Sequence, residues 1–80
     1  MTRDEIFAEL KSVLVESFMV EESAVTPQAH LYTDLDFDSI DAIDLAAKIH
    51  AVTGKQLSPD QFKDVRTIDD AVDMIEKLIS

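Results

Sequence analysis

The chain has no cysteine and no tryptophan, and it contains only one glycine and two prolines. Without cysteine it cannot form disulfides, thiolate zinc sites or a cysteine nucleophile. Its 46% hydrophobic content and its few breaker residues are typical of a folded globular domain and not of a disordered tail. Because 80 residues fit one small domain, we expect a single domain over residues 1–80.

Basic residues are also scarce: seven Lys and Arg stand against seventeen Asp and Glu, a formal net charge of −10 at pH 7. A field of this sign repels nucleic acid and anionic membrane surfaces, so basic protein surfaces are the expected partners. Long apolar runs are missing too, and the stretch from Met1 to Glu5 shows no basic region followed by an apolar segment. We therefore expect a cytoplasmic monomer that does not insert into membranes.

Apolar residues at helical spacing predict a first helix from about Arg3 to about Phe18, preceded by a capping-box pattern of Thr2 with Glu5. The periodicity then fades from Met19 to Asp38, which predicts one long loop. Isolated apolar residues are expected to anchor this loop: Val25, Leu31 and Leu35. A connection of about 20 residues is unusual in a compact domain and is more often functional than idle.

A second helix is predicted to begin at Ser39, capped by the Ser39 hydroxyl or the Asp38 carboxylate, and to end at Gly54. A short third helix is predicted from Ser58 to about Lys63, since it combines a cap residue with proline at the first helical position. Two residues, Thr67 and Asp70, repeat the capping pattern before the last helix, whose predicted buried stripe contains Ile68, Val72, Ile75 and Leu78.

No segment alternates with period two, so strands are not expected. The sequence predicts an all-α fold: a four-helix bundle with three longer helices, one short third helix and a long first loop. The expected core comprises Phe7, Leu10, Leu14, Leu31, Ile43, Leu45, Ala46, Ile49, Phe62, Ile68, Val72 and Ile75.

Five acidic residues surround a single serine, Ser39, at the predicted start of the second helix: Asp34, Asp36, Asp38, Asp41 and Asp44. The first three match positions one, three and five of an EF-hand calcium loop. Position six should be glycine and is Ser39, and position twelve should be glutamate and is Leu45. The match therefore fails, and we expect no dedicated metal site.

Ser39 is a poor candidate for a catalytic nucleophile. Its neighbours are carboxylates, the Gly-x-Ser-x-Gly pattern of hydrolases is missing, and nothing in the sequence connects His30 or His50 to it. An 80-residue helical chain also offers little concave volume for a substrate. We therefore expect no enzymatic activity and no catalytic residues.

Asp34-Leu35 followed by Asp38-Ser39-Ile40 resembles the modification site of acyl carrier proteins, and the predicted helix order extends this resemblance over the whole chain. The resemblance implies that Ser39 receives 4'-phosphopantetheine from coenzyme A through a phosphopantetheinyl transferase. The protein would then carry acyl intermediates as thioesters between separate enzymes. The arm would supply the thiol that the chain lacks, while the protein would supply positioning and recognition.

The same resemblance implies that chain-extending enzymes such as ketosynthases and acyltransferases bind through basic surfaces. We expect Asp36, Asp41 and Asp44 to form the acidic face, with Ile40 and Ala47 as its apolar centre. Asp38 is interpreted as part of the recognition patch or as a helix cap. The predicted core residues are alternatively interpreted as lining a gap that an acyl chain could enter.

The chain departs from the family pattern at two places. The position of Asp36 is usually glycine, and the late second helix, where many members keep acids, contains Lys48, His50 and Ala51. Together with Ala47 and the stretch 61–70, Asp36 suggests carriers of polyketide or aryl polyene pathways at least as much as fatty acid carriers. Two alternatives stay open: a peptidyl (aminoacyl) carrier, and an unmodified acidic interaction module in which Ser39 is only a cap.

Overall fold

The computed structural model of the chain describes residues 2–55 and 64–79. Its helices are α1 (Arg3–Ser17), the 3-10 turn η1 (Glu22–Ala24), α2 (Ser39–Thr53) and α3 (Ile68–Ile79). The predicted all-helical class is confirmed, and so is the first predicted helix, which ends at Ser17 with Phe18 as its C-cap. The predicted short helix from Ser58 to Lys63 lies outside the described residues.

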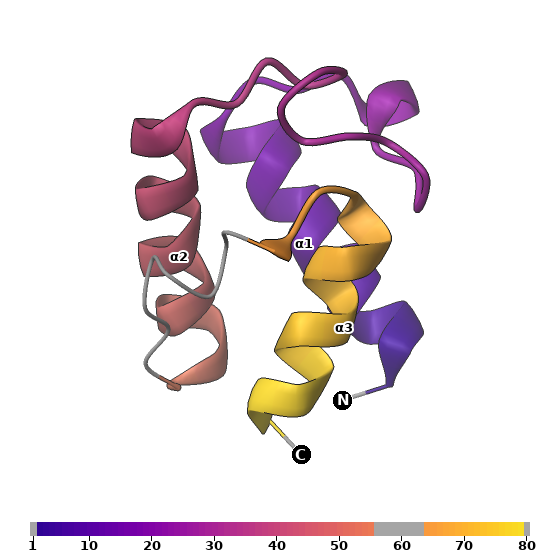
Figure 1. Cartoon of the computed structure of the whole chain (residues 1–80). Coiled ribbons are helices and arrows are strands. Elements are labelled where there is room, and N and C mark those ends of the chain that lie inside the picture. The colour runs from indigo at the N-terminus through magenta and orange to yellow at the C-terminus, as the bar shows by residue number, and fades with distance from the viewer. Residues whose placement is uncertain (1, 56–63, 80) are drawn as a thin grey trace.

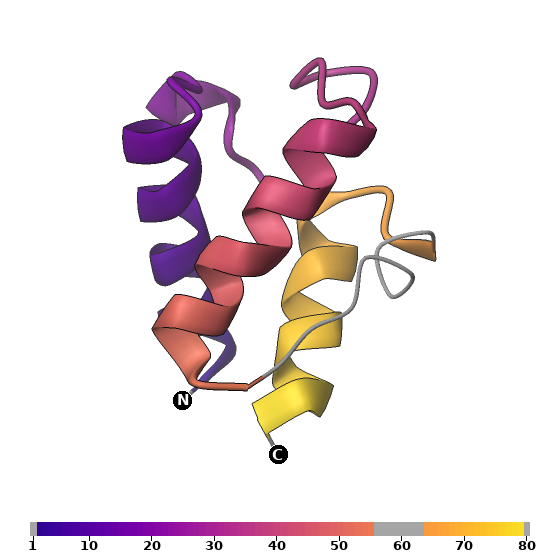
Figure 2. The same cartoon turned by 90° about the vertical axis from the view of Figure 1, so that its left-hand side faces the viewer.

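The three helices pack as a bundle with the long loop across one end (Figure 1). In this view α1 rises towards the loop, and α2 and α3 both descend from it, so that the N-terminal end of α2 lies beside the loop. Figure 2 shows α2 in front of the other two helices, with its outer face uncovered by any described segment. None of the helices in the described ranges is long and apolar enough to cross a membrane.

The core lies between the helices and extends under the loop. Most of the predicted core residues that the structure describes are buried, while Phe7 is partly buried against them. The buried set is Ile6, Leu10, Leu14, Val25, Ala29, Leu31, Phe37, Ala42, Leu45, Ala46, Ile49, Val65, Ile68, Ala71, Val72 and Ile75. The predicted core residue Phe62 lies outside the described residues.

The assignment of Ile43 to the core is wrong. Its side chain is 53% exposed, whereas its smaller neighbour Ala42 is buried. Consecutive residues point about 100° apart on a helix, and the buried face of α2 is centred on Ala42, Leu45 and Ile49, which leaves Ile43 at the edge. The apolar residues of α2 extend beyond its buried face, so apolar character alone did not show that Ile43 lies outside that face.

The long loop is packed down, as predicted, by Val25 and Leu31, which are buried, and by Leu35, which is partly buried against the core. Phe37 is a further anchor that the sequence analysis did not identify. Its ring is buried and lies 5.0 Å from the ring of Phe18, centroid to centroid. The loop is thereby fixed two residues before Ser39.

Backbone hydrogen bonds join the middle of the loop to the start of α3. The Leu31 amide donates to the Arg66 carbonyl at 2.8 Å, and the Ile68 amide donates to the Ala29 carbonyl at 3.0 Å. His30 and Thr67 form an isolated antiparallel bridge between these bonds. Within the described residues no β-strand accompanies this isolated bridge, so the expectation of no strands is confirmed there.

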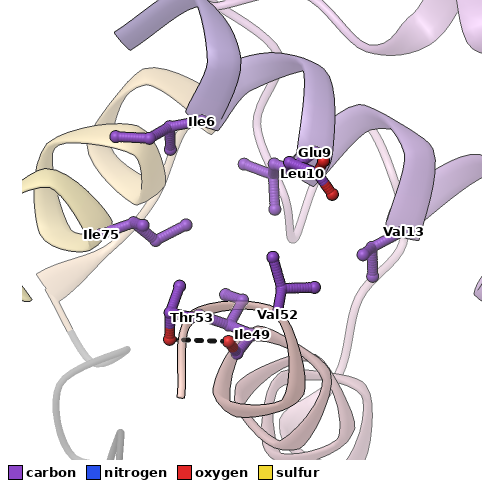
Figure 3. Close-up of a pocket in the computed structure, with 8 residues that line it drawn as sticks. All are labelled: Ile6, Glu9, Leu10, Val13, Ile49, Val52, Thr53 and Ile75. Carbon is purple, nitrogen blue, oxygen red and sulfur yellow. Dashed lines mark hydrogen bonds between the residues drawn. The ribbon is translucent and has the colours of Figure 1, made fainter. Parts of the chain in front are cut away.

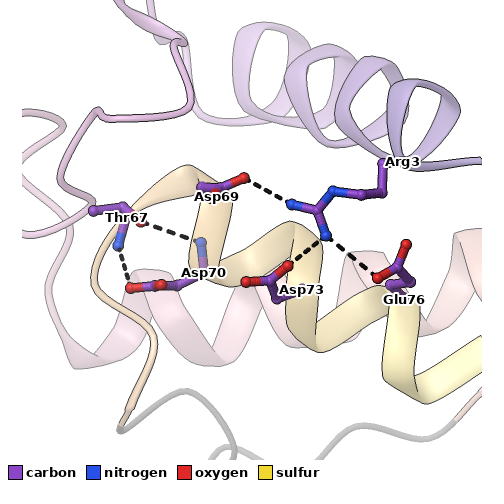
Figure 4. Close-up of polar contacts among 6 residues, drawn as sticks. All are labelled: Arg3, Thr67, Asp69, Asp70, Asp73 and Glu76. Atoms are coloured by element: carbon purple, nitrogen blue, oxygen red, sulfur yellow. Dashed lines mark hydrogen bonds and ion pairs between the residues drawn. The ribbon is translucent and has the colours of Figure 1, made fainter.

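Arg3 fastens α1 to α3 (Figure 4). Its guanidinium donates to Asp69 at 2.8 Å, to Asp73, and to Glu76 at 3.3 Å. The hydrogen bond with the Asp73 side chain is the main cause that raises the pKa of Arg3. One cation thus offsets the mutual repulsion of three carboxylates that line one side of α3.

Candidate functional site at the start of helix α2

Asp38 and Asp41 cap the start of α2 reciprocally. The Asp38 side chain accepts a hydrogen bond from the Asp41 amide at 2.9 Å, and the Asp41 side chain accepts one from the Asp38 amide at 3.3 Å. Ser39 is therefore the first helical residue and not the cap, so one of the two predicted caps, the Ser39 hydroxyl, is wrong and the other is confirmed. A carboxylate here also suits the positive end of the helix dipole.

Ser39 itself is exposed. No group among residues 2–55 and 64–79 forms a hydrogen bond with its hydroxyl, and the same part of the structure provides no acceptor for the amides of Ser39 and Ile40. Such free amides at a helix N-terminus favour a phosphate group. The hydroxyl and the two amides thus form a small polar site that is open to solvent.

Asp36 adopts a left-handed backbone conformation, with φ 56°. This conformation costs little for glycine and roughly 1–2 kcal/mol for most other residues, although aspartate tolerates it better than they do. The structure therefore keeps the backbone geometry for which glycine is suited, and places a carboxylate at that position. The exposed Asp36 side chain adds a charge to the acidic group beside Ser39.

The outer face of α2 brings together the residues that the sequence analysis assigned to partner binding. Ile40 is 75% exposed, and Asp44 and Ala47 are exposed as well, while Asp41, which takes part in the cap, is partly covered. Ile43 joins this face, which the sequence analysis did not predict. Three-residue and four-residue spacing places these side chains on one side of the helix.

An apolar recess lies between the three helices at the other end of α2 (Figure 3). Its cavity volume is about 20 Å³, and it is partly open to solvent. Of the residues predicted to be core or to line a gap, Leu10, Ile49 and Ile75 contribute to its wall. Since Ile49 lies ten residues after Ser39, the recess is about 15 Å further along the helix axis than the serine.

The carboxylates around Ser39 do not converge. Asp34 points back to the loop, where it accepts the His30 amide at 2.8 Å, and Asp38 and Asp41 are engaged in the cap. In the part of the chain that the structure describes, no three acidic or histidine side chains come close enough to hold a metal ion. The arrangement is thus an exposed hydroxyl within an acidic surface.

A family model and the sequences of known proteins indicate the same family for this chain. The model of the phosphopantetheine attachment site family matches residues 8–75. The chain is 42% identical to acyl carrier protein 2 of Ralstonia nicotianae over 80 residues, which cover 100% of this chain and 99% of that one. It is 41% identical to the acyl carrier protein of Coprothermobacter proteolyticus over 76 residues, 95% of this chain and 93% of the other.

Solved structures agree. The fold matches the acyl carrier protein of Thermotoga maritima with a TM-score of 0.81 at 22% identity, covering 96% of this chain and 89% of that chain. It matches the acyl carrier protein of Enterococcus faecalis with a TM-score of 0.77 at 27% identity, covering 98% and 99%. The chain therefore belongs to the acyl carrier protein family, whose members are carriers and not catalysts, bear covalent 4'-phosphopantetheine, and interact with a phosphopantetheinyl transferase and with biosynthetic enzymes.

Proposed function

We propose that Ser39 is the residue that bears 4'-phosphopantetheine and that the protein carries acyl groups as thioesters on this arm. The observation that carries the proposal is that Ser39 is exposed at the first position of α2 while Asp38 and Asp41 perform the capping. The reading of Ser39 as a mere helix cap therefore has no support in the hydrogen bonds. With the cap supplied by its neighbours, the hydroxyl is available for modification.

The proposed attachment is a phosphoryl transfer. The Ser39 oxygen bonds to the phosphorus that bears the pantetheine group of coenzyme A, the pyrophosphate P–O bond breaks, and 3',5'-adenosine bisphosphate leaves. The hydroxyl proton passes to a base of the transferase. Afterwards the amides of Ser39 and Ile40 and the positive end of the helix dipole offset part of the repulsion between the phosphodiester and nearby carboxylates.

The exposed face around Ser39 is the proposed contact for partner enzymes. Asp36, Asp41 and Asp44 present negative charge, and Ile40 and Ala47 are exposed on the same face of α2 as its apolar centre. Opposite charges steer the encounter of two proteins, and a small exposed apolar patch gains from burial. We assign this face to the transferase, to ketosynthases and to acyltransferases, and Asp38 to the part of it next to the arm.

The proposed cargo is an acyl intermediate of fatty acid, polyketide or aryl polyene synthesis. An aminoacyl cargo, as on a peptidyl carrier, is the second candidate, and the acidic start of α2 favours the acyl type. Loading the holo-protein with malonyl and with aminoacyl donors, followed by intact mass measurement, separates the two. A malonyl adduct without an aminoacyl adduct is the expected result.

The attachment site is tested by intact mass after incubation with coenzyme A and a broad-specificity phosphopantetheinyl transferase. The wild type should gain one phosphopantetheine and Ser39→Ala should gain none. Ser23→Ala, which removes another exposed hydroxyl, should be modified like the wild type. A folded wild type that gains no mass, or a modified Ser39→Ala, would remove Ser39 from this role.

A further inference from the structure

The charge along α2 changes sign. Its first half and the residues just before it, 36–44, contain Asp36, Asp38, Asp41 and Asp44 and no basic residue. The following stretch, 45–55, contains Lys48, His50 and Lys55 and no acidic residue, in a chain in which acids outnumber Lys and Arg by seventeen to seven. In so acidic a chain the second half of α2 would also be expected to contain acidic residues, but it contains none.

Stabilisation of the helix itself explains only part of this pattern. Acids in the first turn and a basic residue in the last turn complement the helix dipole, and His50 lies in that last turn. Lys48 lies before the last turn, where the dipole has little effect. Its ammonium group is 3.8 Å from the Asp44 carboxylate, an exposed contact of a kind that contributes little to stability.

The two ends of the outer face are far enough apart to act separately. Asp41 and Lys48 are seven positions apart, or about 10 Å along the helix axis, which exceeds the Debye length of about 8 Å at physiological ionic strength. The two signs meet at Asp44 and Lys48, which are in contact at 3.8 Å. Ala47 lies between them and is exposed, and its small side chain allows another surface to approach closely. A partner lying along α2 therefore meets negative charge first and positive charge further on.

We infer that the enzyme that docks along α2 presents a bipolar surface, basic opposite Asp41 and Asp44 and acidic opposite Lys48. The inference rests on the proposed function, because it concerns a partner of the same face. It specifies that partner beyond a general preference for basic surfaces, since a uniformly basic enzyme would be repelled by the second half of the helix. Lys48 is thereby a specificity residue for partner choice.

The test measures acyl transfer from the loaded carrier to the active-site cysteine of a ketosynthase chosen because it accepts the wild type. Lys48→Glu should lower kcat/KM by about 5- to 10-fold, because it places an anion opposite the acidic patch of the partner. The matched control is Lys11→Glu on α1. Its side chain is 32% exposed against 36% for Lys48, and it contacts Glu22 at 3.5 Å, so both variants change charge equally in similar surroundings.

The control should keep kcat/KM within about two-fold of the wild type, and melting temperatures of both variants equal to that of the wild type would exclude a folding defect. If Lys48→Glu keeps or raises kcat/KM, a uniformly basic partner is indicated and the bipolar surface is overturned. Intact mass of each carrier before the assay separates this result from failure of the proposed function. A chain that takes no phosphopantetheine overturns both, whereas a fully loaded Lys48→Glu with unchanged transfer overturns the bipolar surface alone.

Discussion

The starts of α2 and α3 share one local device and differ in what they expose. At α2, Asp38 and Asp41 cap each other's amides. At α3, the Asp70 amide donates to the Thr67 hydroxyl at 3.1 Å and the Thr67 amide donates to Asp70 at 3.2 Å, which is the same reciprocal pattern. The residue that follows the cap is exposed Ser39 in α2, but in α3 it is Ile68, which is fully buried.

This difference shows that the same reciprocal cap can begin a helix whose first turn is exposed and a helix whose first turn packs into the core. In α3 the first turn is held against the loop, because the Ile68 amide donates to the Ala29 carbonyl and the Asp69 amide donates to the Pro27 carbonyl, both at 3.0 Å. In α2 the first turn leaves Ile40 and Ser39 uncovered. One first turn stabilises the bundle, and the other is available to partners.

The largest expected effect comes from truncating the two isoleucines in these first turns. Ile68→Ala should lower the free energy of unfolding by about 2–5 kcal/mol, because it opens a cavity in the core, whereas Ile40→Ala should change it by less than about 0.5 kcal/mol. Urea unfolding followed by circular dichroism measures both. Since Ile68→Ala could prevent folding of so small a domain, Ile68→Val, with an expected loss of about 1 kcal/mol, serves as the milder variant. Equal losses at the two positions would contradict the comparison.

Replacing the capping residues should have an intermediate effect on folding stability. It should also distinguish the capping role of Asp38 from a role in partner recognition. Asp38→Ala and Thr67→Ala should each cost about 1 kcal/mol, because each leaves a helix amide without its acceptor. Asp38→Asn keeps the capping oxygen and should restore most of that stability. If Asp38 also belongs to the recognition surface, Asp38→Asn should still slow phosphopantetheine transfer, measured as the initial rate of mass gain. A normal rate would assign Asp38 to the cap alone.

The smallest expected effect is the loss of folding stability at low pH through the cap of α3. Hydrogen bonding from the Thr67 amide lowers the pKa of Asp70 below its ordinary value of 3.8. As the pH falls, the Asp70 carboxylate therefore takes up a proton in the unfolded chain before it does so in the folded one. Its contribution to the free energy of unfolding is present above pH 3.8 and is lost as the pH falls through the lowered pKa. Asp70→Asn should remove this contribution, and the melting temperatures of variant and wild type should differ by less at about pH 3 than at about pH 6. A constant difference would contradict the assignment.

The ends of the helices could be predicted from the sequence, because they depend on hydrogen bonds between residues close together in the chain. Two reciprocal caps, Thr2 with Glu5 and Thr67 with Asp70, were predicted and are confirmed, and so is the end of α2 at Gly54, which adopts a left-handed conformation as a C-cap. Each depends on residues within a few positions of one another. The position of Ser39 at the start of α2 followed from the same reasoning.

What the sequence did not predict depends on contacts between distant segments. The burial of Phe37 requires Phe18 to lie beside it, and the position of Arg3 depends on three carboxylates at residues 69–76. The exposure of Ile43 depends on which side of α2 faces the bundle. Helical spacing states which residues share a face but not how far around the helix that face extends, so these features became visible only with the helices placed together.

The aspartate at position 36 also affects the chain before it folds. A glycine there would sample many backbone conformations in the unfolded state and lose them all on folding, whereas a residue with a side chain has fewer to lose. Part of the energetic cost of the left-handed backbone at Asp36 is therefore offset by a smaller entropy loss. The segment leading to Ser39 should consequently be more pre-organised than a glycine-containing one, and the anchor point of the arm should be held more narrowly in direction when a partner enzyme approaches.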